Sequence, residues 1–327
     1  MTAIAIIGTG GTIASEAHDP LDVLGYDERG RKLAADELVA RLPESARSGL
    51  ELHVLPFTPV GSEKIGPDTW RELARMIRVA AAARPELAGF VILHGTSTLE
   101  ETAWYLNLVL EVSQTVVLTG AQRPASAVGA DGPANLHAAL RVAASPEARH
   151  SGVLVVLNDE IHSAREVSKT STYRLNAFTS PEAGPLGVVD GDRVVMQRRP
   201  LRPHARASPF AGFDGALPRV DIAYAYAGAD GVAVRAFAAA GARGIVSAGL
   251  VPGLVTPEEE AALHEARARG IAIVQGVRGA GGRVAPRPAL DEAGFIAAGS
   301  LNPQKARILL MLALAAGVEA EWCFATL

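Results

Sequence analysis

Hydroxyl side chains gather beside glycines in two segments of the chain. The first segment is Gly8-Thr9-Gly10-Gly11-Thr12, and the second is His94-Gly95-Thr96-Ser97-Thr98. A threonine or serine hydroxyl can act as a nucleophile when a base removes its proton, and glycines let backbone amides approach a ligand closely. The first segment is not a dinucleotide fingerprint, because Ile13 stands where the third glycine would be. It is therefore either a plain tight turn or a catalytic loop.

The second segment also has a purely structural interpretation. Ser97 or Thr98 is suited to cap a helix, and Glu100 in the following turn offsets the helix dipole. The same arrangement makes a carboxylate-binding and nucleophile site, since a helix N-terminus offers free N–H groups. Lys169, in a later loop, is either a solvated surface charge or, where the fold brings it to Thr96, a base.

Strand-like and helix-like runs alternate along the first part of the chain and must position these loops. We expect strands at 3–7, 51–56, 89–93, 115–119 and 152–157, and helices at 68–83, 98–112 and 132–144. This alternation is typical of βαβ units with a mainly parallel sheet. Ligands of such sheets bind outside the carboxyl ends of the strands, where both hydroxyl-rich segments lie.

A second domain is predicted after a segment without periodicity. Residues 193–219 are rich in proline and arginine and read as an extended linker. Further strands are expected at 222–226, 244–248 and 271–275, with helices at 230–240, 257–269 and 302–316. The prediction is an α/β protein with a larger N-terminal domain at 1–192, whose mainly parallel sheet is flanked by helices. A smaller C-terminal α/β domain with a parallel sheet follows at 220–327.

Composition excludes several classes of protein. A net charge of −4 over 327 residues argues against nucleic acid as a partner. The single cysteine, Cys323, excludes a disulfide within the chain. The apolar run 308–318 is shorter than the roughly 20 residues of a membrane span, so no membrane partner is expected. The first residues lack a basic leader region, and the expected location is the cytoplasm, with an already removed leader left open.

The hydroxyl-rich segments, taken together, resemble the bacterial-type L-asparaginase/glutaminase family. The resemblance covers nearly the whole chain in the right order. It rests on segments 8–14, 94–96 and 98–102, on Asp131-Gly132-Pro133 with Asn135-Leu136, and on Leu301-Asn302-Pro303-Gln304-Lys305-Ala306-Arg307.

The resemblance implies an amidohydrolase that converts the side-chain amide of L-asparagine, or a related small amide, to the acid and ammonia. Thr12 is then the nucleophile that forms an acyl-enzyme, and Tyr26, on a lid-like loop flanked by turn-prone residues 27–30, helps to remove its proton. Thr96 and Lys169 form a second hydroxyl–base pair. Neither a metal nor an organic cofactor is implied, and the sequence contains no His-Glu-x-x-His motif.

Substrate binding and assembly follow from the same resemblance. Ser62 is expected to bind the α-carboxylate of the substrate, and Gly95, Ser97 and Glu63 are expected to contact the rest of the substrate molecule. The family builds its site between two subunits, and a homotetramer of intimate dimers is expected. The apolar run 308–312 exceeds what one helix face buries in a small domain, which also favours an interface.

The sequence departs from the family pattern where the α-ammonium group of the substrate binds. Members usually carry Asp at the position of Ser97, and stretches 248–253 and 283–288 offer no clear acidic counterpart. Glu63 remains as a carboxylate, unless Asp291 or Glu292 takes the role. The alternatives are an amidase for a dicarboxylic monoamide without the ammonium, and a non-catalytic binder. A binder has no need of two hydroxyl–base pairs.

Overall fold

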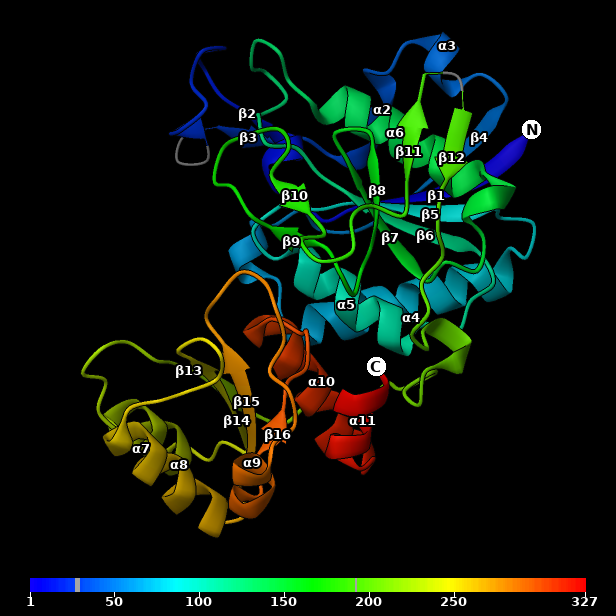
Figure 1. Ribbon diagram of the computed structural model, residues 1–327. Helices are drawn as coiled ribbons and strands as arrows, with labels where there is room; N and C mark the ends of the chain where they lie inside the picture. Colours follow the sequence, from blue (N-terminus) through cyan, green and yellow to red (C-terminus); the bar gives the residue numbers. More distant parts are fainter. Residues whose placement is uncertain (27–29, 192) are drawn as a thin grey trace. The chain divides into compact units, whose positions relative to one another are not determined.

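The computed structural model describes residues 1–26, 30–191 and 193–327 of the chain (Figure 1). Residues 27–29, three of those expected to flank the Tyr26 loop, therefore lie outside the described residues. The chain forms two compact units, Met1–Gly212 and Phe213–Leu327.

The first unit is built on an eight-stranded sheet in the order β12-β11-β8-β7-β6-β5-β1-β4. Its strands are β1 (Thr2–Gly8), β4 (Leu50–Leu55), β5 (Gly89–Leu93), β6 (Thr115–Thr119), β7 (Val153–Leu157), β8 (Glu160–Ser163), β11 (Gly187–Asp190) and β12 (Arg193–Met196). Neighbours from β4 to β7 pair in parallel, and β8, β11 and β12 continue the sheet antiparallel. The mainly parallel sheet predicted from the sequence is confirmed, and the antiparallel edge was not foreseen.

Helices cover both faces of this sheet (Figure 1). Helices α2 (Ala35–Ala40) and α6 (Gly132–Ala144) lie on one face, while α4 (Pro67–Ala83) and α5 (Leu99–Val109) lie on the other. Successive strand residues point to opposite faces. Ile4 and Ile6 of β1 thus join the core beneath α2 and α6. Strands β1, β5, β6 and β7 are consequently buried on both faces, and their carboxyl-end loops are held on a rigid base.

Short elements complete the first unit and carry part of the site. They are β2 (Ser15–Glu16), β3 (Arg31–Lys32), α3 (Glu44–Arg47), β9 (Ser168–Lys169), β10 (Phe178–Thr179) and four 3-10 helices: η1 (Thr12–Ala14), η2 (Ser62–Lys64), η3 (Pro146–Ala148) and η4 (Ala205–Ala207). Strand β2 pairs antiparallel with β3, and β9 pairs antiparallel with β10.

The segment expected to be a linker differs in the structure. It begins with β12, an edge strand of the large sheet, and the first unit continues to Gly212. Arg199 donates to the carbonyl of Glu147 at 2.9 Å, and Arg206 donates to the carbonyl of Glu111 at 2.7 Å. These guanidinium groups attach the proline-rich stretch to the unit, where β12 and the short η4 are its regular elements. The lack of periodicity in the sequence therefore predicted a linker where the chain up to Gly212 packs on the first unit.

The second unit contains a four-stranded, fully parallel sheet in the order β13-β14-β15-β16. Its elements are β13 (Val220–Tyr224), α7 (Val232–Ala239), β14 (Gly244–Gly249), α8 (Pro257–Ala268), β15 (Ala272–Val277), α9 (Pro288–Ala293), β16 (Ile296–Ala297), α10 (Pro303–Ala316) and α11 (Ala320–Thr326). Helix α10 begins as expected, with the Asn302 side chain accepting from the Lys305 amide at 3.0 Å. The predicted α/β class is confirmed.

One argument for an interface does not hold. Residues Ile308, Leu309, Leu310, Met311 and Leu312 on α10 are at most 2% exposed within the single chain. Helix α10 packs on β13, β14 and β15 and against α11, so these elements supply the burial that one helix face alone lacks. In the described part of the chain, none of the helices combines the length and apolar character that a membrane span requires.

Candidate active site

Backbone contacts hold the loops after β1, β4 and β5 together. The amide of Thr9 donates to the carbonyl of Leu93 at 2.8 Å, and the amide of Val60 donates to the carbonyl of Thr9 at 2.8 Å. Gly11 has a φ of 82°, and a Cβ there would collide with the backbone of Gly95. Glycine is required at this point because two loops touch through their backbones. Thr12 and Thr96, each one residue further along, are thereby brought into the same region.

Thr12 and Tyr26 form the first hydroxyl pair. The Oγ1 atom of Thr12 lies 2.7 Å from the Oη atom of Tyr26, and either atom can donate. Thr12 opens the short helix η1, and Tyr26 lies in the excursion between β2 and β3. Both side chains are half-buried. The phenol oxygen is close enough to take the Thr12 proton directly, as general base catalysis requires.

Lys169 and Thr96 form the second pair. The Nζ atom of Lys169 donates to the Oγ1 atom of Thr96 at 2.7 Å. Thr96 is buried, and Lys169 is half-buried on β9. Burial lowers the pKa of the Lys169 ammonium, because the charged form loses hydration. Lys169 is thus not a solvated surface charge, and its neutral amine can accept the Thr96 proton at a lower pH than an ordinary lysine.

Glu100 docks the strand that carries Lys169. Its carboxylate accepts from the Ser168 hydroxyl at 3.0 Å and from the Lys169 amide at 3.3 Å. Glu100 is 6% exposed, in the first turn of α5. The helix-dipole interpretation missed this contact. Helix α5 is buried on almost every side, so a carboxylate there needs donors from the protein, and Ser168 and Lys169 supply them.

His94 is a buried structural group rather than a base. The indole N–H of Trp70 donates to Thr102 Oγ1 at 3.0 Å, and this hydroxyl lies 2.9 Å from His94 Nε2. Since the Gly95 carbonyl can only accept, His94 Nδ1–H donates to it at 2.8 Å, and Nε2 of the neutral ring accepts the Thr102 hydroxyl proton. Burial lowers the pKa of His94 to about 4. The neutral ring therefore fixes the backbone between Gly95 and Thr96.

Three side chains expected at the substrate have free polar groups. Ser62 is buried against the backbone of Gly95. A Cβ atom added to Gly95 would lie 2.8 Å from the Ser62 Oγ atom. Glu63 and Ser97 are exposed. Within the described chain, the side chains of Ser62, Glu63 and Ser97 make no hydrogen bond or ion pair with another residue. Their polar atoms are available to a ligand, whereas the side chains of the Thr12–Tyr26 and Thr96–Lys169 pairs are engaged with each other.

The Thr98 side chain does not cap α5. Thr98 occupies the cap position, but its hydroxyl donates to the carbonyl of Ser62 at 2.8 Å. The hydrogen bond ties η2 to the loop after β5, so it holds Ser62 beside Gly95. Asp291 and Glu292, the other acids considered for the ammonium, are exposed on α9 of the second unit.

The Asp131 motif organises the loop after β6. The Asp131 carboxylate accepts from the amides of Gln122 and Arg123, each at 2.9 Å. The Asn135 side chain donates to the carbonyl of Gly120 at 3.0 Å. These contacts fix backbone and leave the motif with a supporting role. No group of three or more His, Cys, Asp or Glu side chains in the described residues is placed to hold a metal ion.

Comparisons with known proteins agree with this architecture. Family models described as "Asparaginase, N-terminal" and "Glutaminase/Asparaginase C-terminal domain" match residues 3–202 and 219–322. A probable periplasmic L-asparaginase of Haemophilus influenzae is 38% identical over 95% of this chain and 88% of its own length. A glutaminase-asparaginase of Pseudomonas fluorescens biotype A is 39% identical over 95% of this chain and 86% of its own length.

A solved structure extends the similarity to the whole fold. The crystal structure of a probable cytoplasmic L-asparaginase from Campylobacter jejuni has a TM-score of 0.95 and 36% identity, covering 100% of both chains. Together with the matched family models, this similarity includes both units and every loop of the site. The chain therefore belongs to the asparaginase family of amidohydrolases.

Proposed function

We propose that the protein hydrolyses the side-chain amide of L-asparagine to aspartate and ammonia through a threonine acyl-enzyme. One observation carries the proposal. Two hydroxyl groups, on loops that touch at Gly11 and Gly95, each lie 2.7 Å from a group that can take a proton. The relatives named L-asparaginase and glutaminase-asparaginase support the substrate class.

The first half of the reaction forms the acyl-enzyme. The Thr12 oxygen attacks the amide carbonyl carbon while its proton passes to Tyr26. Tyr26 passes a proton on to the amide nitrogen in the same step, so that it does not hold a second proton. The carbon–nitrogen bond then breaks, and the nitrogen leaves as ammonia. A threonine ester remains.

The second half returns the enzyme to its starting state. Water attacks the ester carbonyl, and the Thr96–Lys169 pair accepts the water proton because the burial of Lys169 favours its neutral form. The carbon–oxygen bond of the ester breaks, and the free acid leaves. The proton taken from water by the Thr96–Lys169 pair is returned to the Thr12 oxygen, which restores both groups.

Substrate recognition falls to the groups that have no protein partner. Ser62 hydrogen-bonds the α-carboxylate, and Glu63 with Ser97 faces the α-ammonium. A dicarboxylic monoamide without the ammonium is a second candidate substrate. It is favoured by Ser97, which offers a neutral hydroxyl in an exposed turn beside Thr96.

Ammonia release tests the proposal. Wild type and Thr12→Ala are incubated with L-asparagine, L-glutamine and succinamate, and folding is monitored by circular dichroism. We expect wild type to release ammonia fastest from L-asparagine, and folded Thr12→Ala to release none. Turnover of Thr12→Ala within tenfold of wild type would overturn the nucleophile assignment. A clear preference for succinamate would select the second substrate.

We infer a cytoplasmic location, and the names of the relatives divide on it. The Campylobacter protein is described as probably cytoplasmic, and the Haemophilus protein as periplasmic. Fractionation of the native host, with activity followed in each fraction, tests the inference. Release of the activity by osmotic shock would contradict it.

A further inference from the structure

Tyr26 lies in the loop between β2 and β3, and these two very short paired strands close the loop. Strands β2 and β3 pair Ser15 with Lys32 and Glu16 with Arg31. Side chains alternate along a strand, so Ser15 and Lys32 share one face of the ladder and Glu16 and Arg31 share the other. Two residue pairs are too few to hold a hairpin alone in water. Other contacts must therefore set the position of Tyr26.

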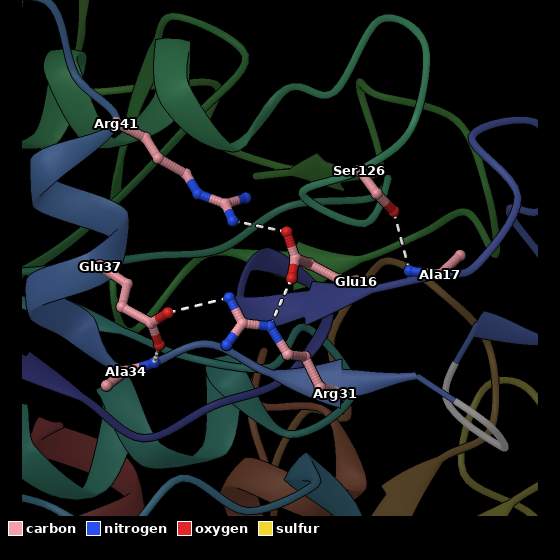
Figure 2. Close-up of polar contacts among 7 residues, drawn as sticks. All are labelled: Glu16, Ala17, Arg31, Ala34, Glu37, Arg41 and Ser126. Atoms are coloured by element: carbon pink, nitrogen blue, oxygen red, sulfur yellow. Dashed lines mark hydrogen bonds and ion pairs between the residues drawn. The ribbon is translucent and has the colours of Figure 1, made fainter.

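Four charged side chains join this hairpin to helix α2, and we call them the hairpin clamp: Glu16, Arg31, Glu37 and Arg41 (Figure 2). The Glu16 carboxylate accepts from Arg31 Nε at 2.6 Å and from Arg41 Nη2 at 2.5 Å. Arg31 also donates to Glu37 Oε1 at 2.9 Å. Positive and negative groups thus alternate in the order Arg41, Glu16, Arg31 and Glu37. Glu16 and Arg31 each have two partners of opposite charge.

The clamp is anchored on a fixed part of the fold. Glu37 lies within α2, and its second carboxylate oxygen accepts from the Ala34 amide at 2.9 Å (Figure 2). Leu38 and Val39 of the same helix are buried in the core of the large sheet. The two arginines lower the pKa of the Glu16 carboxyl, Arg31 through the largest contribution, so Glu16 is charged at neutral pH. The clamp therefore connects the hairpin to the core.

The ladder is also braced toward Thr12. The Ser15 hydroxyl donates to the Gly11 carbonyl at 3.0 Å and accepts from Lys32 Nζ at 2.7 Å. On the neighbouring loop, Ser126 Oγ accepts from the Ala17 amide at 2.8 Å (Figure 2). One end of the ladder thus contacts the residue before Thr12. The clamp holds the strand that leads back from Tyr26.

We propose that the hairpin clamp is a positioning device for the first hydroxyl pair, setting the Tyr26 oxygen at hydrogen-bond distance from Thr12. The proposal rests on the proposed function, in which Tyr26 takes the Thr12 proton. Isolated exposed ion pairs contribute little to stability. The effect of the clamp is instead on the distance between the Thr12 and Tyr26 oxygens, because a displacement of about 1 Å in a reacting pair can cost 10²-fold in rate.

A double-mutant cycle tests the proposal, with kcat and KM for ammonia release from L-asparagine as readouts. The variants are Glu16→Gln, Tyr26→Phe and the double variant. We expect Glu16→Gln to lower kcat about 5- to 20-fold with little change in KM, because positioning is lost while binding groups remain. In the Tyr26→Phe background the same change should alter kcat less than twofold, because nothing remains to be positioned.

A second variant and a matched control sharpen the result. Arg41→Met removes the other partner of Glu16 and should reproduce the loss in kcat. Glu265→Gln breaks an exposed pair of similar geometry with Arg235 (2.8 and 2.9 Å) in the second unit and should leave kcat unchanged. Salt of about 1 M, which screens exposed charges, should lower kcat in wild type more than in Glu16→Gln.

The outcomes separate the two proposals. An unchanged kcat in Glu16→Gln, or an equal loss with and without Tyr26, would overturn the positioning role while leaving the proposed reaction intact. Full activity in Tyr26→Phe would overturn both the role of Tyr26 and the clamp that serves it.

Discussion

Replacing Ser97 by aspartate restores a negative charge to the turn beside Thr96. Ser97 is exposed and its hydroxyl is available, so the aspartate fits without displacing a core side chain. Glu63 is the other carboxylate assigned to the ammonium, and it is exposed as well. Recognition of an α-ammonium group should therefore improve in Ser97→Asp.

The size of the gain follows from exposure. Hydrogen bonds to charged groups contribute about 1.5–3 kcal/mol, whereas exposed ion pairs contribute roughly 0.2–1 kcal/mol. A bound substrate covers the turn only in part, so we take a gain that spans the upper end of the second range and the lower end of the first, about 1–2 kcal/mol. This corresponds to roughly 5- to 30-fold in kcat/KM for L-asparagine.

The assay compares kcat/KM for L-asparagine and for succinamate, which lacks the ammonium. Ser97→Asn is the matched control, because it has the shape of aspartate without the charge. Only Ser97→Asp should gain, and only on L-asparagine. An equal gain in Ser97→Asn, or a gain on succinamate, would refute the electrostatic reasoning.

The same variant should shift the pH profile. An added carboxylate favours the charged form of a nearby amine, so the lowered pKa of Lys169 should rise. In the proposed mechanism the neutral amine is the base, so the rising limb of kcat should move to higher pH. A limb that stays in place would show that the aspartate does not act on Lys169.

Three further predictions concern the second pair and assembly. Lys169→Met should lower kcat about 10²- to 10⁴-fold, the range of general base catalysis, and near-normal turnover would exclude Lys169 as the base. Glu100→Ala removes the carboxylate that accepts from Ser168 and Lys169 of β9, and kcat should fall at least tenfold, which is about 1.4 kcal/mol. Glu100→Gln should recover part of this loss. A kcat in Glu100→Ala equal to that of wild type would refute docking by Glu100. Sedimentation at micromolar concentration should show at least a dimer, in line with the proposed homotetramer, and a 34.0 kDa species alone would contradict it.

Local sequence patterns located most of the fold. Strand β5 is a short, continuous apolar run, and helix α6 has proline in its first turn; both are local sequence signals, and the bounds of both elements were predicted as the structure has them. The prediction failed where long-range contacts outweigh local preference. Strand β12 is a short edge strand without a sequence signal of its own, and it forms because β11 offers a pairing edge.

The candidate site was predicted by resemblance and not by spacing. Thr96 and Lys169 are separated by 73 positions, and no local rule joins them. Glu100 escaped notice because an acidic residue in a first helical turn already has a sufficient local explanation. Its role becomes visible only when β9 is placed against α5.

Trapping the acyl-enzyme tests the central claim most directly. Wild type is mixed with the better of L-asparagine and succinamate, quenched in acid within milliseconds, digested and mapped by mass spectrometry. An acyl group on the peptide that contains Thr12, absent in Thr12→Ala, is the expected result. Ammonia release with the acyl group on Thr96, or with rapid turnover retained in Thr12→Ala, would contradict the mechanism.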